Sequence, residues 1–328
     1  MKKLAGVLIL IVLISCKQKS KKIKLFGPVF GTSFNIQYYT EDNTNYQKQF
    51  DSLFTVVNKS MSTYIPDSKI SKINKGETVE VDEHFIRVFE TAKRIYRETE
   101  GAFDPTIGAV VNAWDFGPEG RITKIDSTAI DSLMKTVGYN RMGLVDRKIV
   151  KSSNSFLDFN AIAKGYGVDV IGEFLESKEI KDYLVEIGGE LRVRGINLEK
   201  KSSWKAGVQR PRFDGVSDPN DYVIAVSLEN ESMATSGSYR KFKIDENGNR
   251  YAHIINTKTG YPSKTNILSV SVLATDCMTA DGYATAFQAM GIEAVTEFLY
   301  KHPELKVYFI YEDDSNELKT LNLNDFPE

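Results

Sequence analysis

An acidic residue and a hydroxyl residue lie four positions apart near the C-terminal end of the chain, in the segment CMTADGYATAFQAMG at residues 277–291. Side chains four apart share one face of a helix, so Asp281 and Thr285 would project together. Both are hard oxygen donors, which suit Mg²⁺ or Ca²⁺ better than Zn²⁺. The pair also fits a helix without metal, with Asp281 favoured by the helix dipole and Thr285 bonding back to the backbone.

A lysine and two glycines mark a second segment, LDFNAIAKGYGVD at residues 157–169. It joins a predicted strand at 155–159 to a predicted helix at 160–178, with Asn160 as the N-cap. Helix N-terminal amides attract phosphate, and Lys164 adds a positive charge. Gly165 and Gly167 each lower helix stability by about 1 kcal/mol relative to Ala, which indicates a close approach. A ligand or tight packing of the helix on a sheet would explain it.

The third segment, RYAHIINTKTGYP at residues 250–262, contains His253. This histidine lies on a predicted strand that enters a turn with Gly260 and Pro262. It has the chemistry of a general base near neutral pH. A hydrogen-bonded structural histidine is the alternative interpretation.

Several regular elements must position these segments. Apolar spacing predicts helices at 46–61, 83–98 and 277–291, and alternation predicts a strand at 30–40. Residues 182–195 read as strand, glycine turn and strand, and residues 239–256 as a hairpin around the turn ENGN. Further strands are expected at 222–229, 267–274 and 306–312, with loops at 117–127 and 212–221. The fold class is therefore α+β, with packed helices and a mixed, largely antiparallel sheet.

Composition sets the limits on function. The 328 residues predict one large or two intimately joined units, and 41% hydrophobic with 26% charged residues is typical of a globular protein. The formal net charge of −2 argues against a nucleic-acid-binding surface. The two cysteines are Cys16 and Cys277. No intramolecular disulfide is expected, and Cys277 is interpreted as a small core residue.

The N-terminus MKKLAGVLILIVLISC has the charged start and apolar middle of a signal peptide, assigned to residues 1–15. Its ending LISC resembles the lipobox of bacterial lipoproteins, in which the cysteine is lipidated; an incidental cysteine is the alternative. Cys16 is therefore the expected lipidation site. Residues 16–24 are expected to form a basic tether, and residues 25–328 the folded domain.

Eight segments in order resemble the ApbE family of flavin transferases, the FAD:protein FMN transferases. The resemblance runs from Phe30 to Gly291, and many such proteins are exported lipoproteins. The matching segments are GTSFNI, MSTYIPDSKISKIN, GAFDPTIG, LDFNAIAKGYGVD, VEIGGELRVRG, MATSGSYRKF, HIINTKTGYP and MTADGYATAFQAMG.

The resemblance implies an ApbE-like fold with FAD in a central cleft. It also implies a reaction, in which FMN passes from FAD to a threonine or serine hydroxyl of a target protein and AMP leaves. Mg²⁺ would be held by the side chains of Asp281 and Thr285 and the backbone carbonyl of Ala161, and His253 would activate the hydroxyl. The residues implied to contact FAD are Phe30, Tyr64, Ala102, Phe103, Asp104 and Lys164.

Two positions depart from the family pattern. Phe30 stands where the family usually has Met, which affects flavin packing, although an aromatic ring is a plausible substitute there. Asn256 and Thr257 replace the common Asp-Pro pair, and we expect a looser turn as a result.

The resemblance also implies partners and a location. The acceptors would be envelope proteins, in particular redox-complex subunits with an acceptor threonine. The enzyme would be lipid-anchored to a bacterial membrane, facing the periplasm or the cell exterior. Two alternatives use the same motifs: an FAD pyrophosphatase that releases FMN and AMP, and a non-catalytic FAD-binding lipoprotein. Retention of Asp281, Thr285 and His253 argues against the second.

Overall fold

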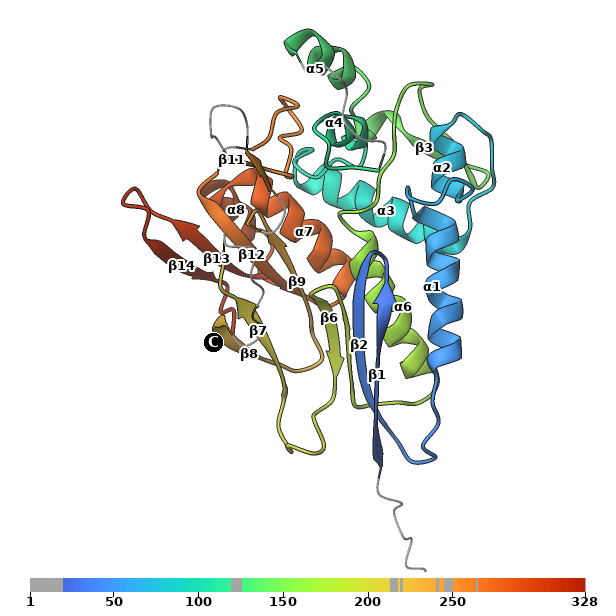
Figure 1. The fold of residues 1–328 in the computed structure, drawn as a ribbon, viewed down its shortest axis with the longest axis vertical. Coiled ribbons are helices and arrows are strands. Elements are labelled where there is room, and N and C mark those ends of the chain that lie inside the picture. Colours follow the sequence, from blue (N-terminus) through green and yellow to red (C-terminus); the bar gives the residue numbers. More distant parts are fainter. Residues whose placement is uncertain are drawn as a thin grey trace, which may run out of the picture.

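The computed structural model describes residues 20–118, 126–212, 218, 221–239, 242–244, 250–263 and 265–327 (Figure 1). Cys16, the tip of the predicted ENGN hairpin and most of the predicted loops 117–127 and 212–221 lie outside these ranges. In the part described, no helix has both the length and the apolar character needed to cross a membrane.

One eight-stranded sheet forms the centre of the fold, in the order β1-β2-β5-β6-β9-β12-β13-β14. Every neighbouring pair is antiparallel, which confirms the predicted fold class. The strands are β1 (Lys21–Val29), β2 (Thr32–Thr40), β5 (Tyr183–Ile187), β6 (Glu190–Arg194), β9 (Ser232–Gly237), β12 (Ile267–Ala274), β13 (Lys306–Glu312) and β14 (Leu318–Leu323).

Helices cover one face of this sheet. α6 packs against β5 and β6, α7 packs against β9 and β12, and α1 and α3 lie beyond them (Figure 1). The helices are α1 (Gln47–Met61), α2 (Lys69–Asn74), α3 (Glu83–Glu98), α4 (Gly108–Ala113), α5 (Ser127–Met134), α6 (Ala163–Ser177), α7 (Cys277–Met290) and α8 (Ile292–Leu299), with a 3₁₀ turn at Tyr139–Arg141.

Three two-stranded ribbons complete the fold: β3 (Gly143–Val145) with β4 (Lys148–Val150), β7 (Trp204–Gln209) with β8 (Tyr222–Leu228), and β10 (Phe242–Ile244) with β11 (Arg250–Ala252). The β7–β8 ribbon packs Trp204 and Val226 against the sheet face opposite α6 and α7, in a core that includes Leu184 and Val193. Val185, the next residue along β5, belongs to the core under α6. Both faces of the central sheet are therefore covered.

The predicted helices around the site agree with the structure. α3 spans the predicted residues 83–98, begins where the Asp82 side chain accepts a hydrogen bond from the Phe85 amide, and is followed by Gly101 at a φ of 81°. A side-chain cap and a left-handed glycine are the usual signals of helix ends. α1 begins at Gln47, one residue later than predicted, and α7 ends one residue earlier, at Met290.

Two predictions at the ends of elements were wrong. Residues 155–159 form only an isolated bridge at Phe156, because neighbouring amides bond elsewhere: Leu157 donates to the Asn74 side chain and Asp158 donates to the Pro105 carbonyl. The following helix begins at Ala163 rather than 160. The Asn160 amide instead donates to its neighbour Asp158 in a tight turn.

The basic segment near the N-terminus also differs from expectation. β1 begins at Lys21, so the last four residues of the expected tether pair with β2 instead of lying free in solvent. Lys22 additionally forms an ion pair with Glu199 at 2.9 Å. Because β1 is an edge strand, its lysines also discourage pairing with other chains.

Candidate active site

Helices α6 and α7 approach each other closely at the two segments that carry the predicted metal and phosphate residues. A Cβ on Gly165 would lie 2.7 Å from the Cβ of Asp281 and would also collide with the Cys277 carbonyl oxygen. A side chain at position 165 would therefore push the helices apart. The close approach predicted at Gly165 is therefore made by helix α7, and the predicted packing of this glycine on a sheet was wrong.

Asp281 and Thr285 lie on α7 as predicted. The Asp281 carboxylate is almost fully buried, and its Oδ2 accepts a hydrogen bond of 2.9 Å from the Gly165 amide. This amide lies in the first turn of α6, whose N-terminal amides are predicted from the sequence to attract a phosphate. Among the described residues, Asp281 Oδ1 accepts no hydrogen bond, and the half-buried Thr285 hydroxyl makes no back-bond to its own helix. Both oxygens are therefore available as ligands.

Lys164 forms an ion pair of 2.5 Å with Glu190, the first residue of β6. The Glu190 side chain is 5% exposed and the Lys164 side chain 33%. Burial lowers the pKa of Lys164, but the charges of Asp281 and Glu190 outweigh burial and raise that pKa overall. Burial raises the pKa of Glu190, against the opposing effect of Lys164. Lys164 is therefore a permanently charged ammonium at neutral pH.

The site also contains oxygen atoms of the kind that bind a hard cation. One ammonium faces two carboxylates, Asp281 and Glu190, in a largely buried place, and Glu190 Oε2 has no hydrogen-bond partner in the described part of the chain. The Ala161 carbonyl belongs to the turn directly before α6, and its role as a metal ligand stays a prediction. Mg²⁺ prefers such hard oxygens and retains several waters. Within the described ranges, no three His, Cys, Asp or Glu side chains lie together as a set that could hold a metal ion by themselves.

Phe30 packs onto helix α6 from the turn between β1 and β2. Phe30 and Gly31 both have positive φ, 48° and 75°, as a two-residue hairpin turn requires. The Phe30 ring makes an edge contact with Phe54 at 5.6 Å, and a Cβ on Gly167 would lie 2.5 Å from that ring. Gly167 therefore makes room for Phe30. Contact of Phe30 with FAD stays a prediction.

Tyr64 lies at the surface near this region, with 59% of its area exposed. Partial burial raises the pKa of its phenol, and the Asp158 carboxylate adds to the rise. The preceding Thr63 accepts a hydrogen bond of 3.4 Å from Asn160, the residue before Ala161. Tyr64 is therefore placed beside the segment that enters α6, where an exposed ring is free to stack on a ligand.

The segment 102–104 is more internal than its predicted role suggests. Phe103 is buried and Ala102 half-buried. The Asp104 carboxylate accepts hydrogen bonds from the Thr106 amide at 2.8 Å, the Thr106 hydroxyl at 2.6 Å and the Tyr139 amide at 3.3 Å. Burial raises the pKa of Asp104, and these hydrogen bonds oppose the rise. The carboxylate holds this loop in shape, and its contact with FAD stays a prediction.

His253 directly follows β11 and is half-buried, with its ring 6.2 Å from the ring of Phe116. The turn after it is well bonded. Asn256 Oδ1 accepts from the amides of Lys258 and Thr259. The expected loosening was therefore wrong, because an asparagine side chain stabilises such a turn without Asp-Pro.

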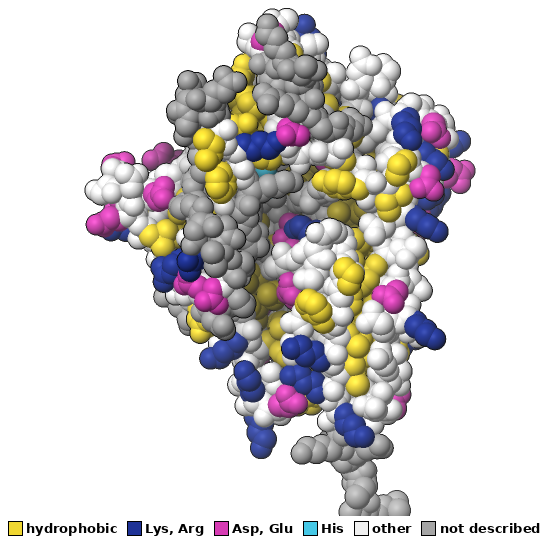
Figure 2. Space-filling model, in the orientation of Figure 1, with side chains coloured by type: hydrophobic (Ala, Val, Ile, Leu, Met, Phe, Trp, Pro, Cys, Tyr) yellow, Lys and Arg dark blue, Asp and Glu magenta, His cyan; other side chains and the backbone are white. Residues whose placement is uncertain are grey.

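Thr257 connects the histidine segment to the rest of the site. Its hydroxyl donates a 2.6 Å hydrogen bond to the Gly101 carbonyl, directly before Ala102. Two predicted regions, 253–257 and 101–104, are thus joined. Figure 2 shows part of a histidine side chain on this face, close to a basic and an acidic side chain.

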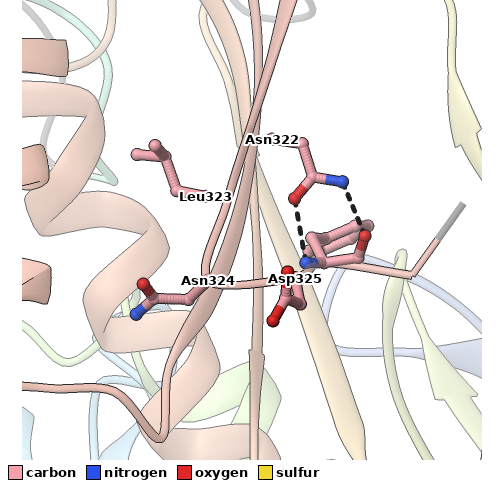
Figure 3. A pocket seen from close by; sticks show the side chains of 5 residues that line it. Asn322, Leu323, Asn324 and Asp325 are labelled. Carbon is pink, nitrogen blue, oxygen red and sulfur yellow. Dashed lines mark hydrogen bonds between the residues drawn. The ribbon is translucent and has the colours of Figure 1, made fainter.

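Two other concave regions lie apart from these residues. A cavity of about 670 Å³ is lined by residues 322–326 near the C-terminus, where the Asn322 side chain bonds twice to the Phe326 backbone (Figure 3). Another, of about 540 Å³, lies between α1, α3 and α6 and includes His84, whose Nδ1 is 2.7 Å from the Tyr166 hydroxyl. Neither is lined by any predicted site residue.

The sequence reasoning missed two buried carboxylates, Glu190 and Asp169. Glu190 is in the segment VEIGGELRVRG and Asp169 ends LDFNAIAKGYGVD, so both segments were identified without these residues. An acidic residue that starts a strand or lies on a helix usually faces solvent. The available signal was their position among apolar neighbours. Cys277 is buried as predicted, and burial raises the pKa of its thiol.

The fold and this arrangement agree with the comparisons to known proteins. The ApbE family model matches residues 30–309, so the chain belongs to the ApbE family. An FAD:protein FMN transferase of Vibrio cholerae is 36% identical over 298 residues, covering 87% of this chain and 86% of that protein. One from Haemophilus influenzae is 35% identical over 318 residues, covering 92% and 90%.

A solved structure supports the same assignment. The flavin transferase ApbE from Vibrio cholerae superposes with a TM-score of 0.83 at 32% identity, covering 94% of this chain and 99% of that one. The similarity therefore includes the sheet, the helices over it and every predicted site segment from Phe30 to Gly291.

Proposed function

We propose that this chain transfers FMN from FAD to a threonine or serine hydroxyl of a target protein, with Mg²⁺ as cofactor and AMP as the leaving product. The transferase assignment rests on family membership and on relatives of that name at 35–36% identity. The observation that supports the metal-dependent form is the hydrogen bond between the Gly165 amide of α6 and the Asp281 carboxylate of α7, next to Lys164.

The residues of the chain have distinct roles in this reaction. Asp281, Thr285 and the Ala161 carbonyl would hold Mg²⁺, which when bound neutralises charge on the diphosphate of FAD. Lys164 supplies a further positive charge to the same diphosphate. Phosphoryl transfer depends mainly on such positioning and charge stabilisation.

His253 acts on the acceptor. It takes the proton of the acceptor hydroxyl, whose oxygen forms a new bond to the FMN phosphorus. The bond from that phosphorus to the bridging oxygen breaks, and AMP leaves with this oxygen. If water replaced the acceptor, the same steps would give free FMN and AMP, which is the pyrophosphatase alternative.

We further propose that the mature chain is anchored through a lipid on Cys16 and acts on proteins of the bacterial envelope, including redox-complex subunits. Residues 1–15 have the features of a signal peptide, and LISC those of a lipobox. With β1 starting at Lys21, only a short stretch separates Cys16 from the fold. Metabolic labelling with a fatty acid, in the wild type and in Cys16→Ala, tests this anchor: label retained in the variant would contradict it.

The experiment for the activity uses the full-length chain in detergent with FAD, Mg²⁺ and a threonine-containing acceptor peptide. Intact mass reports the modified acceptor, and chromatography quantifies AMP and FMN. We expect one FMN per acceptor, an equal amount of AMP, and loss of both with a chelator. AMP with free FMN and unmodified acceptor would favour the pyrophosphatase, whereas bound FAD without AMP would indicate the non-catalytic binding protein.

A further inference from the structure

Asp169 connects α6 to the beginning of α7. It lies on α6 and its side chain is fully buried. Its Oδ1 accepts a hydrogen bond of 3.0 Å from the Cys277 amide, and its Oδ2 accepts one of 2.8 Å from the Met278 amide. These are the first two residues of α7, whose own N-cap, Asp276, accepts from the Thr279 amide. A carboxylate on a neighbouring helix thus satisfies two amides that a helix leaves unpaired.

The connection between the helices is reciprocal. Asp169 of α6 accepts from the amide of Cys277 in α7, and Asp281 of α7 accepts from the amide of Gly165 in α6. The partners are four residues apart on each helix, so the two contacts lie about one helical turn apart. Two such contacts fix both the rotation and the sliding of one helix against the other.

We infer that Asp169 is a positioning residue for the metal site. The donors come from two different pieces of chain: the Ala161 carbonyl precedes α6, whereas Asp281 and Thr285 belong to α7. Metal ligands bind well only when they are held in place by further hydrogen bonds. Asp169 supplies that restraint by fixing the start of α7 against α6. This inference rests on the proposed metal dependence.

Arg192 neutralises the charge of the buried Asp169 carboxylate but makes no hydrogen bond with the backbone amides of α7. Its Nη1 lies 2.9 Å from Asp169 Oδ1, and it also bonds Tyr183 and Glu176. Removing one partner of a buried ion pair strongly destabilises the folded protein. Loss of stability alone therefore does not distinguish a positioning role from a purely structural one. A measurement of metal affinity distinguishes the two roles.

The test measures metal binding directly in the full-length protein, by titrating Mn²⁺ and following the free ion by electron paramagnetic resonance. In Asp169→Asn, the side-chain amide would face a backbone N–H of α7 and lose one of the two bonds. We expect the Kd for Mn²⁺ to rise about 10- to 100-fold, as for other residues that orient metal ligands. The rate of FMN transfer by Asp169→Asn should be much closer to the wild-type rate at saturating metal than at low metal.

Arg192→Lys is the matched control, because it disturbs the same buried network and leaves the bonds to Cys277 and Met278 in place. We expect a lower Tm in chelator for both variants, but a Kd for Mn²⁺ within about threefold of wild type for Arg192→Lys only. A folded Asp169→Asn protein that binds Mn²⁺ like wild type would overturn the inference.

Two further outcomes are distinguishable. If the wild type itself binds no Mn²⁺, the metal dependence under the proposed function fails, and the inference fails with it. If Asp169→Asn does not fold, Gly165→Ala tests the other contact, because its Cβ would separate the helices at Asp281. We expect Gly165→Ala to weaken Mn²⁺ binding at least tenfold; unchanged affinity in this folded variant would also overturn the inference.

Discussion

The α6–α7 contact and the segment that carries His253 are built very differently. At α6–α7, buried carboxylates and backbone amides bond across two long helices in the centre of the molecule. His253 instead follows a two-stranded ribbon with strands of three residues each, and its ring is half-buried beside Phe116. Ile255 packs into a small separate cluster with α4 and α5.

This difference suits the two tasks of the proposed reaction, charge stabilisation on the diphosphate and binding of the acceptor protein. Stabilising charge on a diphosphate requires donors that are fixed before the substrate arrives, which a helix pair under a central sheet provides. A protein acceptor must enter from outside, and surface segments supported by a rigid scaffold are where such contacts usually occur. We therefore expect changes at α6–α7 to have larger effects on the reaction than changes around 253–257.

Asp281→Ala should have the largest effect. It removes the one carboxylate ligand of the proposed metal site, so we expect transfer to fall about 1,000-fold, equivalent to about 4 kcal/mol of transition-state stabilisation. Rates measured by intact mass over a range of Mg²⁺ concentrations test this. Glu293→Ala, which removes an exposed carboxylate from α8, should transfer at the wild-type rate. A normal rate for Asp281→Ala would exclude the metal assignment.

His253→Ala should have the next largest effect, about 100-fold on transfer, the scale of a lost general base. FAD binding, measured by flavin fluorescence, should stay within about twofold, because the diphosphate residues are on other segments. His302→Ala is the control: this histidine stacks on Phe298 in the described structure. Undiminished transfer by His253→Ala would remove the proposed base and leave the metal site untouched.

The pH dependence of stability should also separate the two regions. Burial raises the pKa of Asp169 to about 6, with a contribution from Asp276, while the bonded amides and Arg192 oppose the rise. Its unfolded value is about 3.9, so the folded state binds more protons between about pH 4 and 6. This carboxylate therefore lowers the free energy of unfolding as pH rises through that window, by at most about 1.4 kcal/mol per unit.

Asp169→Asn should lack this contribution. Urea unfolding at about pH 4.5, 5.5 and 6.5 should show a shallower loss of stability with rising pH than in wild type. The Thr257→Val variant, altered in the histidine region, should keep the wild-type slope. Parallel slopes for wild type and Asp169→Asn would mean that Asp169 is ionised across the window.

Much of this fold follows from local sequence. The bounds of α3 follow from the Asp82 cap, the apolar spacing and Gly101, all of which act within a few residues. The placement of Asp281 and Thr285 together on α7 follows the same way, because a helix fixes which side chains share a face. Lys164 lies in the first turn of α6 as predicted, although that helix begins three residues later than predicted.

Long-range contacts account for what was missed. Glu190 is buried only because β6 packs under α6, and its partner Lys164 is distant in the sequence. Residues 155–159 look like a strand, yet their amides bond to Asn74 and Pro105 in other segments. Lys21 is in a strand because β2 is beside it. Local patterns carry no information about such partners.

The smallest predicted effect concerns the hydrogen bond that joins the two predicted regions outside the helix pair. Thr257→Val keeps the shape of the side chain and removes its bond to the Gly101 carbonyl. We expect a loss of about 1 kcal/mol in the free energy of unfolding, the usual net value of such a bond, or more if the carbonyl stays unpaired. Transfer should fall only about two- to fivefold, since His253 keeps its neighbours.

The control for Thr257→Val is Lys258→Ala, at the exposed neighbouring position, which should match wild type in both measurements. Comparing kcat with the KM for the acceptor locates the effect. If Thr257 serves to hold the acceptor-side segment, KM for the acceptor should change while Mn²⁺ affinity does not. A 100-fold loss of kcat would instead show that this segment is as tightly coupled to the chemistry as α6–α7, and the proposed division between the two regions would be wrong.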